Sequence, residues 1–381
     1  MSRKVIVLSV NASWNIVNFR MDLIAALQQE GHDVVALAPE DEYSARLSSF
    51  GVDFHPLRID KQGISPARDL RLMAEYRKAL RRIRPDIFLG YTIKPNIYGS
   101  LVAHALGIPV INNVSGLGTA FIRKGPLTQI VSLLYRLAFR RSATIFFQNR
   151  DDRDLFVGKK IVRADQAQLL PGSGIDLGHF QPGEHKPAED RFAFLFIGRL
   201  LWDKGIGEYV DAARLVRARH PNTSFRMLGF VDAPNRSAVA RAQVEAWARE
   251  GIVDYLGAAE DVRPHIAAAD CVVLPSYREG LPRALLEGAA MGKPLIATDV
   301  PGCRDIVEHG TNGLLCTVRD CNALADAMIE MRESNDARRR GMGARGRSLV
   351  ERGFDRQIVI DRYLAAIERA VSIRGRRAAT G

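Results

Sequence analysis

Cysteine is scarce in this chain of 381 residues, and it is confined to one region. The four cysteines are Cys271, Cys303, Cys316 and Cys321, and their spacing matches no common zinc-binding pattern. The apolar run at residues 5–8 is too short for the core of a signal peptide. Because disulfide frameworks belong mainly to small secreted domains, we expect free thiols in a reducing cytoplasm.

Long apolar runs are also missing. No stretch approaches the roughly 18 consecutive apolar residues of a membrane-spanning helix, so we expect none. Hydrophobic residues still make up 47% of the chain and charged residues 25%, as in an ordinary globular protein. A chain of this length exceeds the size at which a single core stops growing, which predicts two domains.

Charge is not balanced, because the chain carries a net charge of +11. A basic surface suits nucleic acid, anionic lipid or a phosphorylated substrate. Nucleic acid is disfavoured, since the basic residues lack interleaved aromatics and no helix-turn-helix or RNA-binding signature is present. Lipid and phosphorylated substrates remain as candidate partners.

Short apolar runs alternate with helical patterns along the whole chain. Buried strands are expected at residues 4–10, 33–39, 53–54, 86–90, 109–112, 143–147, 192–197, 223–230, 253–257, 271–274, 294–298 and 313–316. This alternation predicts doubly wound parallel sheets that bind ligands at the carboxyl ends of their strands. The polar segment 181–190 indicates a linker, so we expect domains at 1–183 and 184–355.

The loop after the first strand, residues 11–18, lacks the G-x-G-x-x-G fingerprint of dinucleotide-binding proteins. It carries Asn11, Ser13, Asn15 and Asn18 instead. These side chains could bind phosphate groups, or they could serve only to form a turn. The pattern alone leaves both possibilities open.

Residues 275–294 are typical of a strand end, a loop and a short helix. Glu279 lies in the predicted loop, and Glu287 lies about two helical turns further along. The free N–H groups near Arg283 and Ala284 would attract an anion. Carboxylates on either side of a bound diphosphate could accept hydrogen bonds from sugar hydroxyls, which is the layout of a nucleotide-sugar. The alternative is that both glutamates are ordinary surface charges.

The spacing of Glu279 and Glu287 resembles the signature of the retaining glycosyltransferases of family 4. Residues 198–205 resemble the segment with which that family grips a diphosphate, and residues 174–180 resemble the end of its first domain. The resemblance spans nearly the whole chain. It implies the GT-B fold, in which two Rossmann-like domains face a cleft and a C-terminal helix, here 356–372, packs back on the first domain.

The resemblance also implies a chemistry. It assigns catalysis to Arg199, Lys204 and Glu279, in a retaining transfer that needs no metal or other cofactor. Residues expected to bind the donor are Gly198, Gly257, Ala258, Val262, Gly280, Leu281, Arg283, Ala284 and Glu287. The donor would be a nucleotide-sugar, preferably a UDP-sugar such as UDP-GalNAc or UDP-GlcNAc. Within the family, the chain resembles bacterial enzymes that add an N-acetylhexosamine to a polyprenyl-diphosphate-linked sugar.

The acceptor is expected on the first domain. Many family members carry a histidine in the region of residues 112–118, but this chain has none, so Ser115 or a backbone carbonyl would contact the hydroxyl. A mechanism assisted by that histidine is therefore in doubt. The candidate acceptor-binding residues are Asn15, Arg20, Lys94, Ser115, Arg123 and Lys124.

Residues 122–141 form an amphipathic pattern with arginines around it. Such a helix could lie on an anionic membrane, or it could pack against the core with a solvated basic side. We expect a cytoplasmic enzyme that is peripheral on the inner face of the cytoplasmic membrane and assembles surface polysaccharide or glycan. Two alternatives are a nucleotide-sugar epimerase of the same fold and a non-enzymatic basic module that binds nucleic acid or membrane.

Overall fold

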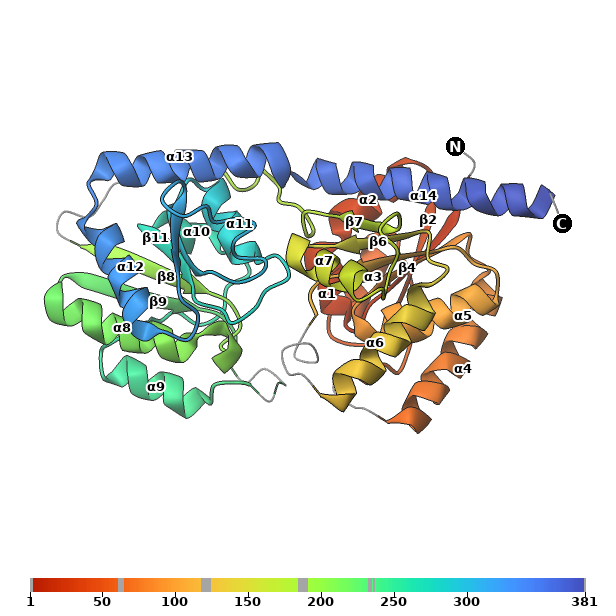
Figure 1. Cartoon of the computed structure of the whole chain (residues 1–381), viewed down its shortest axis with the longest axis horizontal. Coiled ribbons are helices and arrows are strands. Elements are labelled where there is room, and N and C mark those ends of the chain that lie inside the picture. Colours follow the sequence, from red (N-terminus) through yellow and green to blue (C-terminus); the bar gives the residue numbers. More distant parts are fainter. Residues whose placement is uncertain are drawn as a thin grey trace. The chain divides into compact units, whose positions relative to one another are not determined.

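The computed structural model describes residues 3–60, 65–117, 125–183, 191–231, 235 and 237–379, apart from the side chains of 126, 127 and 373–379. Backbone contacts divide the chain into two compact units. Unit 1 comprises Met1–Ser173 with Arg356–Gly381, and unit 2 comprises Gly174–Asp355. Each unit is built around one parallel sheet, as Figure 1 shows.

The sheet of unit 1 has seven parallel strands in the order β3-β2-β1-β4-β5-β6-β7. They are β1 (Val5–Ser9), β2 (Asp33–Ala38), β3 (Asp53–Pro56), β4 (Ile87–Tyr91), β5 (Val110–Val114), β6 (Thr144–Phe147) and β7 (Ala167–Leu169). The order reverses between β1 and β4. In open α/β sheets, ligands bind at the carboxyl edge beside such a reversal.

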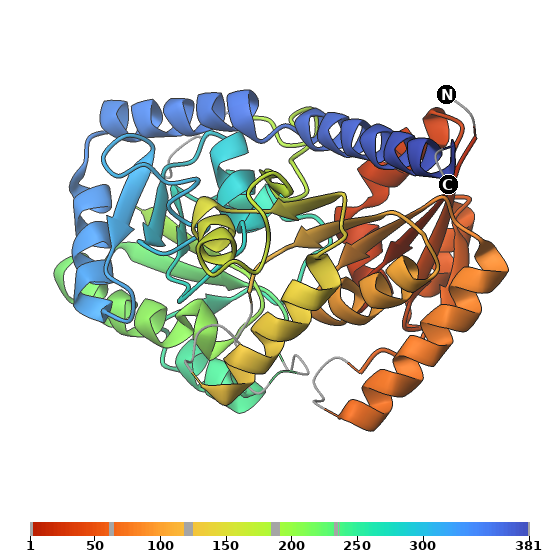
Figure 2. The same ribbon diagram turned by 45° about the vertical axis from the view of Figure 1, so that its right-hand side comes forward.

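Helices cover both faces of this sheet (Figure 2). They are α1 (Ser13–Phe19), α2 (Met21–Gln29), α3 (Ser44–Ser49), α4 (Pro66–Ile83), the π-helix η1 (Pro95–Gly99), α5 (Ser100–Ala105), α6 (Pro126–Phe139), α7 (Arg150–Gly158) and α14 (Arg356–Ala379). One core joins α1, α2 and α14 to the sheet, and another joins α4 and α5 to it. Within the described ranges, no helix is both long and apolar enough to cross a membrane.

The C-terminal helix was expected to end at residue 372. The structure corrects this, since α14 continues to Ala379. Arginine and alanine are good helix formers, and no proline stops the helix in this stretch. Its buried side chains, Tyr363, Ala366 and Ile367 among them, pack in the core of unit 1.

The sheet of unit 2 has six parallel strands in the order β10-β9-β8-β11-β12-β13. The strands are β8 (Phe192–Ile197), β9 (Thr223–Leu228), β10 (Asp254–Tyr255), β11 (Cys271–Leu274), β12 (Leu295–Thr298) and β13 (Gly313–Cys316). The helices are the 3-10 helix η3 (Trp202–Lys204), α8 (Ile206–Arg219), α9 (Arg241–Arg249), α10 (Arg263–Ala267), α11 (Arg283–Ala290), α12 (Cys321–Glu333) and α13 (Asp336–Gly353). Here the strand order reverses between β8 and β11.

The segment after Ser173 belongs to unit 2, although the sequence placed the domain boundary at residues 183 and 184. The backbone N–H of Ile175 donates to the carbonyl of Phe354 at 2.9 Å. The guanidinium of Arg347, on α13, donates to the carbonyl of Phe180 at 2.6 Å. These contacts tie residues 174–180 to the end of unit 2. Most of the expected linker, residues 184–190, lies outside the described residues.

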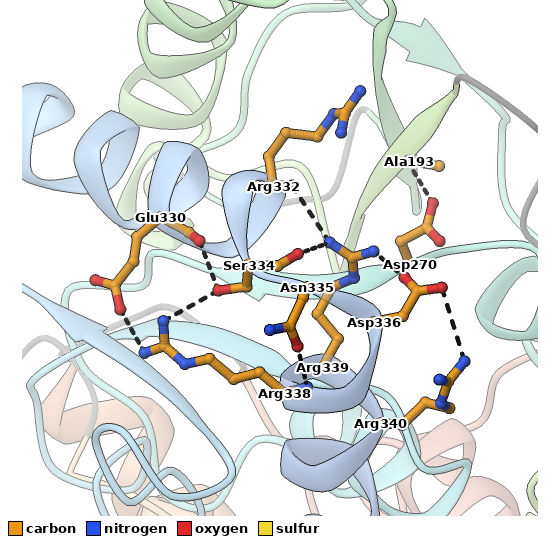
Figure 3. Close-up of polar contacts among 10 residues, drawn as sticks. All are labelled: Ala193, Asp270, Glu330, Arg332, Ser334, Asn335, Asp336, Arg338, Arg339 and Arg340. Atoms are coloured by element: carbon orange, nitrogen blue, oxygen red, sulfur yellow. Dashed lines mark hydrogen bonds and ion pairs between the residues drawn. The ribbon is translucent and has the colours of Figure 1, made fainter.

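Many arginines of unit 2 have structural partners, as the corner between α12 and α13 illustrates (Figure 3). Asn335 caps α13 by accepting the N–H of Arg338 at 2.8 Å. The guanidinium of Arg338 reaches back to Glu330 at 2.6 Å, and Arg339 pairs with Asp336. The net positive charge of the chain therefore does not by itself mark a binding surface at this corner.

Candidate functional site

The loops at the carboxyl ends of the unit 2 strands lie in close backbone contact. A side chain at Gly229, which follows β9, would place its Cβ only 1.8 Å from the carbonyl oxygen of Gly198. A Cβ at Gly205 would lie 2.1 Å from the carbonyl oxygen of Pro275, and Gly205 has a φ of +71°. Glycine is needed wherever two backbones approach this closely. The loops after β8, β9 and β11 therefore form one continuous edge.

Two of the three expected catalytic residues meet at this edge. The ammonium group of Lys204, at the end of η3, forms an ion pair with the carboxylate of Glu279 in the loop after β11. Their side chains are only 21% and 11% exposed. The backbone N–H of Tyr277 donates to the carbonyl of Asp203 at 2.9 Å and ties the same two loops together. Without a ligand, each of the two charges is compensated by the other.

Arg199, the third expected catalytic residue, directly follows Gly198 at the end of β8. Its side chain is exposed and makes no ion pair within the described part of the chain. An arginine in this position can bind a phosphate through two parallel hydrogen bonds. Lys204 is therefore a paired cation, whereas Arg199 is available to a ligand.

Helix α11 begins at Arg283, with Pro282 as the preceding cap residue in an extended conformation. Pro282 makes no side-chain cap hydrogen bond, so the N-terminus of this helix keeps the partial positive charge that attracts anions. Gly292, with a φ of +70°, follows the end of this helix.

Glu287 is buried at 7% exposure, and the guanidinium of Arg283 donates to it at 3.0 Å. Burial raises the pKa of Glu287, and the charge of Arg283 opposes that rise. Together with the low exposure of Glu279, this burial is not what two ordinary surface charges would show. Both carboxylates are held in place by cations on the same edge.

The remaining expected donor residues lie on the same edge of unit 2. Gly257 accepts the N–H of Gly229 at 2.7 Å, and the hydroxyl of Tyr255 donates to the carbonyl of Gly229 at 3.0 Å. Ala258 is exposed, and Val262 directly precedes α10. Gly280, Leu281 and Ala284 lie in the loop before α11 and in its first turn.

Sequence reasoning missed two residues that shape this edge. A Cβ at Gly302 would lie 2.6 Å from the carbonyl oxygen of Gly280, so the turn after β12 supports the Glu279 loop. The hydroxyl of Tyr277 donates to Glu208 at 2.7 Å, and burial raises the pKa of Tyr277 to about 12. Pro301 and Gly302 signal a turn, but the sequence does not indicate which loop that turn contacts.

In unit 1 the loop expected at residues 11–18 is largely helical, because α1 begins at Ser13. The carboxylate of Asp41 accepts the backbone N–H of Ser13 at 2.8 Å and occupies this helix end. The hydroxyl of Ser13 donates to the carbonyl of Pro39 at 3.0 Å. This capping comes from a distant segment, which explains why the sequence pattern did not predict it.

The expected acceptor residues of unit 1 differ in their surroundings. Lys94 is paired with Asp69 at 2.7 Å. Ser115 is half-buried just beyond β5, and Asn15 is half-buried in α1. Arg20 is only 4% exposed. Arg123 and Lys124 lie outside the described residues.

Two family models match the chain. Residues 16–172 match the glycosyl transferase 4-like domain, and residues 191–334 match the glycosyl transferases group 1 domain. The two matches cover most of both units. The chain is thus a glycosyltransferase of family 4 with the GT-B fold, as the sequence predicted.

Solved structures share this fold over nearly the whole chain. A glycosyltransferase from Rickettsia africae has a TM-score of 0.79 at 15% identity and covers 97% of this chain and 99% of its own. Anabaena Alr3699/HepE, solved in complex with UDP and glucose, has a TM-score of 0.76 at 17% identity and covers 96% of this chain and 99% of its own.

Two bacterial relatives act on lipid-linked sugars, according to their names. The first is N,N'-diacetylbacillosaminyl-diphospho-undecaprenol alpha-1,3-N-acetylgalactosaminyltransferase of Campylobacter jejuni, 27% identical over 95% of this chain and 97% of its own. The second is UDP-Gal:alpha-D-GlcNAc-diphosphoundecaprenol alpha-1,3-galactosyltransferase of Escherichia coli, 23% identical over 77% of this chain and 78% of its own. Neither the epimerase nor the non-enzymatic alternative is supported by these matches.

Proposed function

We propose that this enzyme transfers a hexose or N-acetylhexosamine from a UDP-sugar, such as UDP-GalNAc or UDP-GlcNAc, to a polyprenyl-diphosphate-linked saccharide. The observation that carries the donor half is the unit 2 edge, where Arg199, the Lys204–Glu279 pair and the uncapped start of α11 lie at the strand ends. The names of the two bacterial relatives support the acceptor half.

The diphosphate of the donor binds Arg199, Lys204 and the first turn of α11. As the bond between the anomeric carbon and the phosphate oxygen breaks, these groups stabilise the charge on the leaving diphosphate. The acceptor hydroxyl attacks the same face of the sugar, and its proton passes to the leaving phosphate oxygen. This retaining route requires no separate base, which is consistent with the lack of histidine near Ser115.

The two carboxylates then bind the neutral parts of the donor. When the diphosphate becomes the partner of Lys204, Glu279 accepts hydrogen bonds from hydroxyls of the transferred sugar. Glu287, oriented by Arg283, accepts hydrogen bonds from the ribose. The cations of the protein take the place of a metal ion, so we propose that transfer proceeds without metal.

The membrane contact is assigned to α6. Three apolar side chains on this helix, Ile130, Leu133 and Leu137, are 58%, 53% and 52% exposed. Their spacing puts them on one face, while Tyr135 and Phe139 on another face are buried. The helix thus has a second apolar face that faces solvent, with exposed arginines beside it. We propose that this face lies on the anionic inner face of the cytoplasmic membrane, with no role in nucleic-acid binding.

The test is sugar transfer with a panel of UDP- and GDP-sugars, with and without a polyprenyl-diphosphate-linked sugar. We expect transfer from one UDP-sugar to the lipid acceptor, unaffected by chelator and lost in Glu279→Ala. The matched control is Glu245→Ala, which removes an exposed carboxylate from α9 and should keep full activity. Release of an epimerised nucleotide-sugar without acceptor, or no turnover of any donor, would contradict the proposal.

A further inference from the structure

Several buried polar atoms without partners gather at the carboxyl edge of the unit 1 sheet. Among the described residues, Asn15 Oδ1, Arg20 Nε, Tyr91 Oη and Asn113 Oδ1 are buried and make no hydrogen bond. They come from the segment after β1 and from the ends of β4 and β5, beside the reversal of strand order. Because buried polar atoms are nearly always hydrogen-bonded, this concentration indicates a ligand.

Arg20 is the charged member of this group. Its guanidinium carbon lies 4.3 Å from the ring centroid of Tyr91, and its side chain forms no ion pair with any described residue. Burying an unpaired charge is unfavourable, and an arginine cannot lose its proton. Stacking on the tyrosine ring offsets only part of that penalty. The Nε of Arg20 is therefore a buried donor that has no acceptor among the described residues.

Tyr91 and Asn113 are neighbours on adjacent strands. The amide nitrogen of Asn113 donates to the hydroxyl of Tyr363 on α14 at 2.9 Å, which leaves the amide oxygen open to accept a hydrogen bond. The hydroxyl of Tyr91 is kept protonated, because burial and the neighbouring Tyr363 hydroxyl raise its pKa well above the usual value although Arg20 opposes the rise. The group thus offers a cation, a hydroxyl donor and a carbonyl acceptor.

Asn112 shows that the fold can satisfy a buried asparagine in this strand. Its amide nitrogen donates to Asn96 at 3.0 Å and to Ser100 at 2.8 Å, and its oxygen accepts the hydroxyl of Ser142 at 2.7 Å. The next residue, Asn113, has its amide oxygen unpaired. The unpaired oxygen of β5 thus belongs to the asparagine whose amide nitrogen contacts Tyr363 of α14.

We propose that Arg20, Tyr91, Asn113 and Tyr363, here called the Arg20 cluster, bind a sugar that carries a phosphate group. Arg20 and the Tyr91 hydroxyl contact the phosphate, and the Asn113 oxygen accepts a sugar hydroxyl. Tyr363 is a positioning residue that holds the Asn113 amide. The inference rests on the proposed function for the identity of the ligand, which is the sugar diphosphate of the lipid-linked acceptor.

The experiment measures binding of farnesyl-diphosphate-linked N-acetylglucosamine by calorimetry, without donor. Arg20→Met keeps the packing of the stem and removes the charge, and we expect its affinity to fall about tenfold or more. Tyr91→Phe should weaken binding by a smaller factor. Both variants should bind UDP like the wild type and melt at the same or a higher temperature, since they remove unpaired polar groups.

Arg46→Met is the matched control, because Arg46 is an exposed arginine that also lies over a tyrosine ring, that of Tyr43. It should bind the probe with unchanged affinity. Tyr363→Phe separates positioning from direct contact, since it should raise the KM for the acceptor and leave the KM for the donor unchanged.

Two results would overturn the inference: wild type that does not bind the probe, or Arg20→Met and Tyr91→Phe variants that bind it as tightly as wild type. Lower melting temperatures with unchanged affinity would assign the cluster a purely structural role. Transfer to the lipid acceptor with unaltered acceptor KM in Arg20→Met would refute this inference alone. Binding that depends on Arg20, in an enzyme that transfers no sugar, would refute only the proposed function.

Discussion

The carboxyl edges of the two sheets present charge in different ways. In unit 2, Lys204 is paired with Glu279, and Arg283 is paired with Glu287. In unit 1, Arg20 is more deeply buried than either cation and has no carboxylate partner among the described residues. Arg283 and Glu287 are 4 residues apart in the sequence and Lys204 and Glu279 are 75 apart, whereas the Arg20 cluster draws on residues from Arg20 to Tyr363.

This difference has an energetic consequence. A site whose charges are already paired is stable without ligand, and a ligand must displace one partner in order to bind. A site with an unpaired buried charge is unfavourable when empty, so the ligand itself supplies the missing compensation. We therefore expect the donor site to be maintained by the protein alone and the Arg20 cluster to be stabilised by its ligand.

The largest expected effect is on catalysis at the paired site. Lys204→Met removes a charge that stabilises the leaving diphosphate, and kcat should fall by about 100- to 1,000-fold. Steady-state transfer assays with saturating acceptor would measure it. Lys159→Met, which removes an exposed lysine from unit 1, should keep the wild-type rate. A Lys204→Met enzyme within a few-fold of wild type would show that the ion pair is only structural.

The donor site was predictable because its signals are local. Glu279, Arg199 and Lys204 lie in short motifs, and strands, loops and the start of α11 follow from apolar runs, proline and glycine. The sequence did not reveal the ion pairs, for example the one between Lys204 and Glu279. Ion pairs across separate loops depend on tertiary contacts that no sequence spacing encodes.

The Arg20 cluster was only partly predictable for the same reason. Arg20 was a candidate by its charge and position, but Tyr91, Asn113 and Tyr363 carry no pattern that separates them from core residues. Tyr363 reaches Asn113 only because α14 returns to unit 1. A missing hydrogen bond is a property of three-dimensional surroundings, so it becomes visible only in the structure.

Lys293 in unit 2 is a second buried cation, and unlike Arg20 it should make the free energy of unfolding depend on pH. It is 7% exposed and donates to the carbonyl of Ala267 at 2.8 Å. Burial lowers its pKa from 10.5 to about 8, and the charge of Asp270 opposes this shift. Between these two values the unfolded chain binds more protons than the folded chain, so the free energy of unfolding rises with pH.

Wild type should therefore gain about 2 kcal/mol relative to Lys293→Met between pH 8 and 10. Urea unfolding of both proteins at each pH measures the difference between their free energies of unfolding. Groups that titrate alike in both proteins do not contribute to this difference. Arg20→Met is the control, because arginine keeps its proton over this range and the gap to wild type should stay constant. A constant gap for Lys293→Met would mean that the lysine keeps its ordinary pKa.

The smallest expected effect concerns the exposed apolar face of α6. Helix α8 has no such face, because Leu215 is its one exposed large hydrophobic side chain. Leu133→Glu with Leu137→Glu adds two carboxylates to this face, and its binding to vesicles of anionic phospholipid should weaken about tenfold or more. Because both side chains are about half exposed, the free energy of unfolding should change by less than about 0.5 kcal/mol per residue. Leu215→Glu is the matched control and should bind vesicles like the wild type. Equal binding by all three proteins in a sedimentation assay would place the membrane contact elsewhere. If high salt alone caused the same loss of vesicle binding, the contact would be assigned to the arginines of unit 1 rather than to the apolar side chains of α6.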